Sequence, residues 1–206
     1  MIDGGKWIYK EICVKRHFHY LLAFPALVLY KRDKVSKINS DIKRFLHYTS
    51  HNECNDAAFM CLMSQDARFR SIFYYRMYKK KNILLAISRK LLPGLQTIEI
   101  NGKIGGGLMI HHSFAIISPE RAGKNLTVLP GVVIGRGRQD IHSGRLRPVL
   151  GDNVFVGANA SVIGGITIGD NVTIGAGSVV TRDIPNDCTV AGIPAKIISK
   201  NKMERH

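Results

Sequence analysis

The chain has 206 residues, 45% of them hydrophobic and 22% charged, which fits one globular domain, or a body with a smaller extension, and excludes a large multidomain enzyme, a disordered chain and a collagen-like fibre. The formal net charge is +15, and residues 1–97 carry +11 of it because eighteen basic side chains there face seven acidic ones. Such a field attracts nucleic acid, an anionic membrane surface or a phosphorylated cofactor alike, so charge alone does not identify the partner.

The N-terminal region carries a short apolar segment between basic residues. No signal peptide is expected, because the first residues lack a basic-then-apolar order and a small-residue cleavage site. The segment is Tyr20–Tyr30, which contains Pro25 and is bracketed by Lys15, Arg16, Lys31 and Arg32. It is too short to span a membrane. Two interpretations stay open: a buried helix or strand, or an interfacial patch that rests on anionic lipid.

Apolar residues three or four apart predict helices through the rest of this region. The expected helices are Ile38–His47, Cys54–Met63, Phe69–Met77 and Ile83–Leu92, with Pro93 and Gly94 closing the last one. The four cysteines, Cys13, Cys54, Cys61 and Cys188, have no paired spacing. We therefore expect neither a metal site nor a disulfide framework, and a reducing, cytoplasmic location.

A six-residue repeat dominates the second half of the chain. A period of six matches neither an α-helix nor a continuous strand, so it predicts a short strand and a bend, repeated, with an aliphatic side chain pointing inward. The expected inward residues are Ile98, Ile104, Ile110, Ile116, Ala122, Val128, Ile134, Leu150, Val156, Val162, Ile168, Ile174 and Val180. A second inward set stands four places on and includes Leu108, Phe114, Leu126 and Val132.

The repeat falls out of phase once, because sixteen positions separate Ile134 from Leu150. The intervening Arg136–Pro148 (RGRQDIHSGRLRP) is basic and contains glycine, which is typical of a loop. We expect residues 136–148 to leave the repeat as an excursion.

These hexads resemble the repeats of the left-handed parallel β-helix acyltransferases, in which three hexads make one triangular coil. The resemblance implies an α+β chain with a basic helical region over 1–97, a single-stranded left-handed parallel β-helix over 98–198 and a basic tail over 199–206. A helical region before such a prism is similar to the layout of the serine acetyltransferases. The run Phe69–Arg76 (FRSIFYYR) also resembles the segment that precedes their prism.

Acyl transfer to a hydroxyl needs a base for the hydroxyl proton and donors for the oxyanion. The run Gly105–Ile117 (GGGLMIHHSFAII) resembles the serine acetyltransferase signature that ends in the catalytic histidine. This resemblance implies that His112 is the base, with His142 in the loop as the alternative. The family orients its histidine with an upstream aspartate; Glu99 holds that place here, two residues closer to the histidine than in the family pattern.

The acceptor loop departs from the family. Serine acetyltransferases carry an Arg-His-Pro run that engages the amino acid, whereas this chain has Leu146, Arg147 and Pro148. Asp66, Arg147 and His142 are the expected acceptor-binding residues. Because a serine carboxylate would lose a charged partner, worth about 1.5–3 kcal/mol when desolvated, the pattern favours a sugar hydroxyl instead.

The binding site of the acetyl donor is expected by resemblance to the family, which contacts coenzyme A through three features. They are small residues after a hexad glycine, a threonine followed by a basic residue, and a basic residue after Gly-x-Pro-Ala. The resemblance implies that the cofactor-binding residues are Ala158, Ala176, Thr181, Arg182 and Lys196. Small side chains let pantetheine approach the backbone, and the cations can pair with phosphate.

Together these features predict an acetyl-CoA-dependent O-acetyltransferase that uses no metal and acts by direct attack. A homotrimer is expected, with a dimer of trimers left open. The preferred acceptor is a sugar hydroxyl in surface-polysaccharide biosynthesis, and the alternative is L-serine, giving O-acetyl-L-serine for cysteine biosynthesis. A non-catalytic scaffold at the inner face of the membrane is the alternative from another class. Nucleic acid is not expected, because no recognition helix or stacking platform accompanies the charge.

Overall fold

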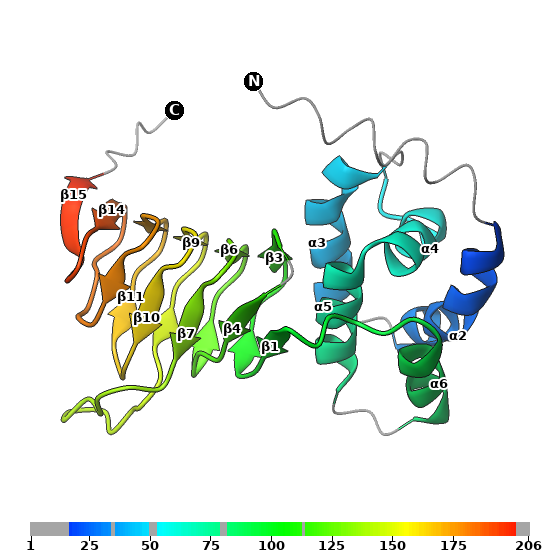
Figure 1. The fold of residues 1–206 in the computed structure, drawn as a ribbon, viewed down its shortest axis with the longest axis horizontal. Helices are drawn as coiled ribbons and strands as arrows, with labels where there is room; N and C mark the ends of the chain where they lie inside the picture. Colours follow the sequence, from blue (N-terminus) through cyan, green and yellow to red (C-terminus); the bar gives the residue numbers. More distant parts are fainter. Residues whose placement is uncertain (1–16, 34–35, 50–52, 79–81, 113, 201–206) are drawn as a thin grey trace. The chain divides into compact units, whose positions relative to one another are not determined.

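The protein is described from a computed structural model, which covers residues 17–33, 36–49, 53–78, 82–112 and 114–200 (Figure 1). Contacts divide the chain into two compact units, Met1–Leu95 and Gln96–His206. The first unit is helical and the second is a solenoid of short parallel strands. The expected α+β class, with helices followed by a left-handed β-helix, is confirmed. Cys13, Lys15 and Arg16 lie outside the described residues.

The helices of the first unit match the apolar periodicity to within about two residues at most ends. They are α2 (His17–Asp33), α3 (Ser36–Phe45) with the 3₁₀ turn Leu46–Tyr48, α4 (Asp56–Gln65), α5 (Ala67–Met77) and α6 (Ile83–Leu91). The segment Tyr20–Tyr30 is thus helical. It buries Ala23, Ala26 and Leu29 and leaves Leu21 and Phe24 exposed.

The core of the helical unit is aromatic. Phe59 lies edge-on to Phe69 and to Phe73, with ring centroids 6.1 and 5.3 Å apart. Beside these rings, Arg76 on α5 donates to both carboxylate oxygens of Asp41 on α3, at 2.8 and 3.0 Å. These two side chains are 3% and 1% exposed, so each charge depends on the other for its solvation.

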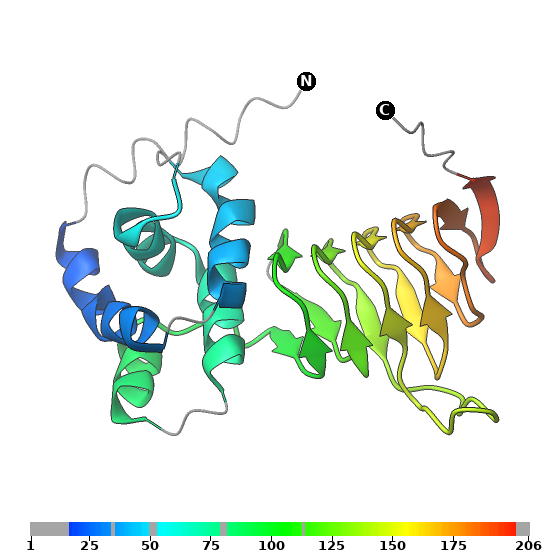
Figure 2. The same cartoon turned by 180° about the vertical axis from the view of Figure 1, so that it is seen from behind.

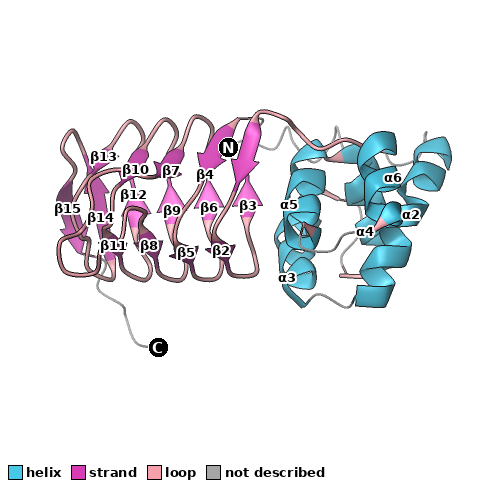
Figure 3. Cartoon of the chain, turned by 90° about the horizontal axis from the view of Figure 1, so that it is seen from below, coloured by secondary structure: helices cyan, strands magenta, loops and turns pink. Residues whose placement is uncertain are grey.

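The solenoid winds through three sheets, and its coils follow one another in a row in Figures 2 and 3. Sheet A contains β1 (Ile98–Ile100), β4 (Ala115–Ile117), β7 (Val133–Gly135), β10 (Ser161–Ile163) and β13 (Val179–Val180). Sheet B contains β2 (Lys103–Ile104), β5 (Arg121–Ala122), β8 (Val149–Leu150) and β11 (Thr167–Ile168). Sheet C contains β3 (Met109–Ile110), β6 (Thr127–Val128), β9 (Phe155–Val156), β12 (Thr173–Ile174), β14 (Cys188–Ala191) and β15 (Lys196–Lys200).

The strand register explains the six-residue period. Lys103 pairs with Arg121, eighteen residues on, so three hexads make one coil. Arg121 in turn pairs with Val149, twenty-eight residues on, because the loop of residues 136–148 is inserted between β7 and β8. The aliphatic side chains fill the prism interior, and Val128, Val156 and Ile174 are fully buried there.

Two of the expected inward positions are wrong. Ile116 is 44% exposed and Phe114 is 52% exposed, whereas Ile117 is fully buried. Ile117, the residue of β4 that pairs with the inward Ile134, therefore follows Ile110 by seven positions and precedes Ala122 by five. The turn before β4, which contains His112, holds the extra residue, and every side chain of β4 moves to the opposite face as a result.

The three sheets meet at three edges, named here by the sheets they join. The B–C edge carries an asparagine ladder, in which the Asn125 amide donates to Asn153, that of Asn153 to Asn171, and that of Asn171 to Asp187, at 2.9, 2.9 and 2.8 Å. All four residues have φ between 55° and 58°. Asparagine tolerates this left-handed region better than most residues, so the ladder stabilises one edge and leaves the other two for function.

Candidate functional site

His112 lies on the C–A edge, in the turn between β3 and β4, and its side chain is exposed. Backbone hydrogen bonds stack this turn on the ones that follow. Gly131 N donates to Phe114 O at 3.1 Å, Asn159 N to Pro130 O at 2.8 Å, and Gly177 N to Ala158 O at 2.7 Å. The edge thus forms a continuous row of turns.

Ala158 and Ala176 lie on this same edge, directly after β9 and β12. At about 4.8 Å per coil, Ala158 lies roughly 10 Å and Ala176 roughly 15 Å along the axis from the His112 turn. A Cβ added at Gly157 would stand 2.6 Å from the nitrogen of Ala176, so only glycine permits this close stacking. Lys196 begins β15 and is the strand partner of Ala191, the last residue of β14, at the end of the solenoid.

Four further predicted site residues of the solenoid lie on the A–B edge. Thr181 and Arg182 follow β13 and are exposed. Arg147 and His142 belong to the loop that leaves this edge between β7 and β8. Sheet A therefore separates the expected base and small donor residues from the expected acceptor arginine within one chain.

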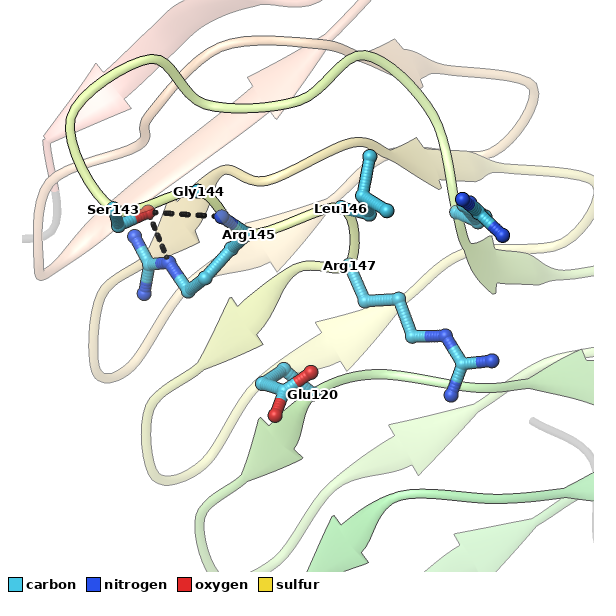
Figure 4. A pocket seen from close by; sticks show the side chains of 7 residues that line it. Glu120, Ser143, Gly144, Arg145, Leu146 and Arg147 are labelled. Carbon is cyan, nitrogen blue, oxygen red and sulfur yellow. Dashed lines mark hydrogen bonds between the residues drawn. The ribbon is translucent and has the colours of Figure 1, made fainter.

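The loop and the A–B edge enclose an open cavity of about 410 Å³ (Figure 4). It is lined by Glu120, Arg136, Ser143, Gly144, Arg145, Leu146 and Arg147. Three guanidinium groups thus share the cavity with one carboxylate. Such a charge balance suits an anion, because arginine binds carboxylates and phosphates in a bidentate manner.

Arg145 is the most firmly held cation of this cavity. Its Nε donates to Ser143 Oγ at 2.8 Å and its Nη2 to Thr167 Oγ1 at 3.1 Å, with Asp140 Oδ2 at 3.9 Å. Asp140 in turn accepts from the hydroxyl and the backbone N–H of Ser143. These hydrogen bonds hold the pKa of Asp140 below its usual value. The network gives the loop a fixed shape and presents Arg147 to the cavity.

Glu120 was missed by sequence reasoning, although its position at the end of a hexad just before β5 offers a signal. Its backbone N–H donates to Pro148 O at 2.9 Å, which places it directly beside the base of the loop. His142, by contrast, is exposed on the loop and does not line the cavity.

Two predicted carboxylates have partners of their own. Glu99 is exposed on β1 opposite Ile116, and its Oε1 accepts from the Asn101 amide at 2.7 Å. In the described part of the chain it makes no hydrogen bond to His112, so the predicted orienting role stays a prediction.

Asp66 in the helical unit is the N-cap of α5. It is 3% exposed, accepts from the N–H groups of Arg68 and Phe69 at 2.8 and 3.2 Å, and forms an ion pair with the Arg68 side chain. An aspartate just before a helix is a common N-cap. Its predicted contact with the acceptor is untested.

No helix in the described ranges has the length and apolar character needed to cross a bilayer. Within the same ranges, His, Cys, Asp and Glu side chains do not gather in threes as metal ligands would.

The solenoid and its glycine-spaced turns are those of a hexapeptide-repeat fold. The family model "Bacterial transferase hexapeptide (six repeats)" matches residues 147–182. A serine acetyltransferase from Synechococcus elongatus is 44% identical over 121 residues, covering 57% of this chain and 48% of the relative. One from Helicobacter pylori strain J99 is 34% identical over 149 residues, covering 70% of this chain and 81% of the relative.

The chain belongs to the serine acetyltransferase family. The solved serine acetyltransferase of Neisseria gonorrhoeae agrees in fold, with a TM-score of 0.59 and 28% identity over 81% of this chain and 65% of that chain. This chain spans about half the length of the Synechococcus relative.

Proposed function

We propose that this protein transfers the acetyl group of acetyl-CoA to a hydroxyl group, with L-serine as the acceptor. The observation that carries the proposal is the C–A edge, where a solvent-facing imidazole is followed along one row of turns by the small residues Ala158 and Ala176. The relatives favour serine over the sugar hydroxyl that the loop sequence favoured, since those matched are named serine acetyltransferases.

In the proposed reaction, acetyl-CoA extends along the C–A edge with its thioester near His112. The imidazole takes the proton of the acceptor hydroxyl while that oxygen attacks the thioester carbon. Backbone N–H groups of the glycine turns stabilise the oxyanion. The C–S bond then breaks, and the imidazolium returns its proton to the coenzyme A thiolate. No covalent enzyme intermediate is needed.

The cations on the path have separate tasks in this scheme. Arg182 and Lys196 are exposed and suited to the phosphates of coenzyme A. Lys196 stands at the C–A edge itself, whereas Arg182 stands on the A–B edge and would be supplied by a neighbouring copy. Arg147 in the loop cavity takes the carboxylate of serine, and Glu120 in the same cavity offers a partner for its ammonium group. Glu99 orients His112 if binding of the substrates turns it away from Asn101.

The placement of these residues supports a homotrimer as part of the proposal. Each face of the prism has about six residues, so its two edges lie up to roughly 20 Å apart. His112 and Arg147 of one chain thus flank sheet A and do not meet. A neighbouring copy that packs its A–B edge against the C–A edge would complete the site. The outward row of sheet A, Ile116, Val133, Ser161 and Val179, is largely apolar and suits such packing.

Mixing two impaired variants tests this shared site. His112→Ala and Arg147→Ala chains are unfolded together, refolded as a 1:1 mixture and assayed for coenzyme A release. About a quarter of the sites should then combine the intact His112 of one chain with the intact Arg147 of its neighbour, and recover activity. Activity no higher than that of either variant alone would show that each site is built within one chain.

An acceptor screen tests the activity itself, with L-serine and a panel of nucleotide sugars compared by thiol release from acetyl-CoA. We expect turnover with serine, and an Arg147→Gln variant with kcat/KM lowered about 10- to 100-fold. Arg138→Gln is the matched control, because Arg138 belongs to the same loop and does not line the cavity. Turnover of a sugar with serine inert would restore the polysaccharide alternative. We place the enzyme in the cytoplasm, where acetyl-CoA is made and used.

A further inference from the structure

The helical unit leaves an apolar surface uncovered on α2 and α6, which pack side by side. Leu21 and Phe24 of α2 are 71% and 58% exposed, and Ile83, Ile87 and Leu91 of α6 are 74%, 39% and 41% exposed. We call these five residues the α2–α6 surface. Their spacings of three and four keep each set on one face of its helix.

The two helices that carry this surface are well packed on their other sides. On their opposite faces the same helices bury Ala23, Ala26 and Leu29 of α2, and Leu85 and Ser88 of α6. Scattered exposed apolar residues are ordinary, but two adjacent helices that each show a row of large ones indicate an interaction site.

Basic residues border the surface. Lys31 and Arg32 stand in the last turn of α2 and Lys90 in the last turn of α6. Arg89, by contrast, donates to Tyr74 O at 3.2 Å and lies over the Tyr74 ring, on the packed side of α6. Lys31 and Arg32 keep 59% and 49% of their side chains in solvent despite ion pairs with Asp56 and Asp33. The segment 1–97 has a formal net charge of +11, which favours an anionic partner for the helical unit.

We propose that the α2–α6 surface docks on an anionic lipid bilayer. Such a membrane offers a partner for both kinds of side chain. The apolar groups enter the boundary of the acyl chains, and the cations contact the phosphate and carboxylate headgroups. A second copy of this chain fits less well, since two units that each carry this positive charge repel one another. The helices lie on the membrane and do not cross it.

Vesicle sedimentation of the full chain tests the proposal. Vesicles of pure phosphatidylcholine are compared with vesicles containing 30 mol% phosphatidylglycerol, at low and at high salt. We expect binding only to the anionic vesicles, weakened at least about tenfold by high salt. Phe24→Ser with Ile83→Ser should weaken it by at least about a further tenfold. Ile198→Ser is the matched control, since Ile198 is equally exposed at 65% but lies in the solenoid.

Each outcome decides the matter. Equal binding to both kinds of vesicle, binding to neither, or an unaffected double variant would overturn the proposal. So would a double variant that changes only the concentration dependence of sedimentation velocity, because a second copy would then be the occupant. Coenzyme A release measured on the same samples keeps this inference separate from the proposed activity, which does not depend on it.

Discussion

The asparagine ladder of the B–C edge offers the most quantitative test of how the prism is held. Asn153 donates one ladder hydrogen bond and accepts another, both at 2.9 Å, with φ at 56°. Each bond contributes about 0.5–1.5 kcal/mol, and the left-handed backbone costs alanine about 1 kcal/mol more. Asn153→Ala should therefore destabilise the solenoid by about 2–4 kcal/mol.

Asn153→Gly separates these two effects. Glycine also loses both hydrogen bonds but adopts the left-handed conformation without strain, so it should cost about 0.5–1 kcal/mol less than alanine. Urea unfolding followed by circular dichroism gives both values, provided that the protomer concentration is kept equal in every sample. Two variants that both unfold within about 0.5 kcal/mol of the original protein would refute the stabilising role of the ladder.

Three further predictions concern groups elsewhere in the chain. Burial raises the pKa of Tyr74 to about 12, so the stability that its protonated phenol provides is complete below about pH 10 and is lost as the pH rises toward 12. The fall of the urea unfolding midpoint between these pH values should therefore be shallower in Tyr74→Phe than in the original protein. Asp41→Ala removes the carboxylate that pairs with the buried Arg76 guanidinium and should cost about 3–5 kcal/mol in urea unfolding. Lys31→Ala breaks an exposed pair and should cost less than about 1 kcal/mol; similar losses would contradict the burial argument. Asp140→Ala removes the acceptor that shapes the loop, so KM for the acceptor should rise several-fold with little change in KM for acetyl-CoA, and equal effects on both constants would contradict this placement.

The sequence was sufficient to predict the prism, because a coil of three hexads must bury one aliphatic side chain in each of its three strands, and that requirement is visible as a period of six. The prediction was wrong at Phe114 and Ile116. The spacing of inward residues is seven from Ile110 to Ile117 and five from Ile117 to Ala122. Because the longer and the shorter spacing add up to two hexads, a strict period of six passes through Ile116 without showing the shift. The asparagine ladder was not predicted, although its spacings are visible in the sequence. Asn153 and Asn171 are one coil of eighteen residues apart, and Asn125 and Asn153 are twenty-eight apart because the loop is inserted between them.

The candidate site was less accessible to prediction from sequence. Residues can be assigned to turns by counting hexads, but which turns share an edge depends on the three-dimensional winding. Only the structure shows that His112 and Ala158 lie on one edge and Arg147 on another. Glu120 was not predicted because a carboxylate at the end of a hexad is common. Only the structure shows that the loop ends beside Glu120 and forms the cavity with it.

The rate of a His112→Ala variant with acetyl-CoA and L-serine tests the central claim most directly. The variant should fold normally, because the side chain is exposed, and should still bind acetyl-CoA, yet lose about 10²- to 10⁴-fold in kcat. An unchanged kcat would contradict the account, since the C–A edge would then hold no base.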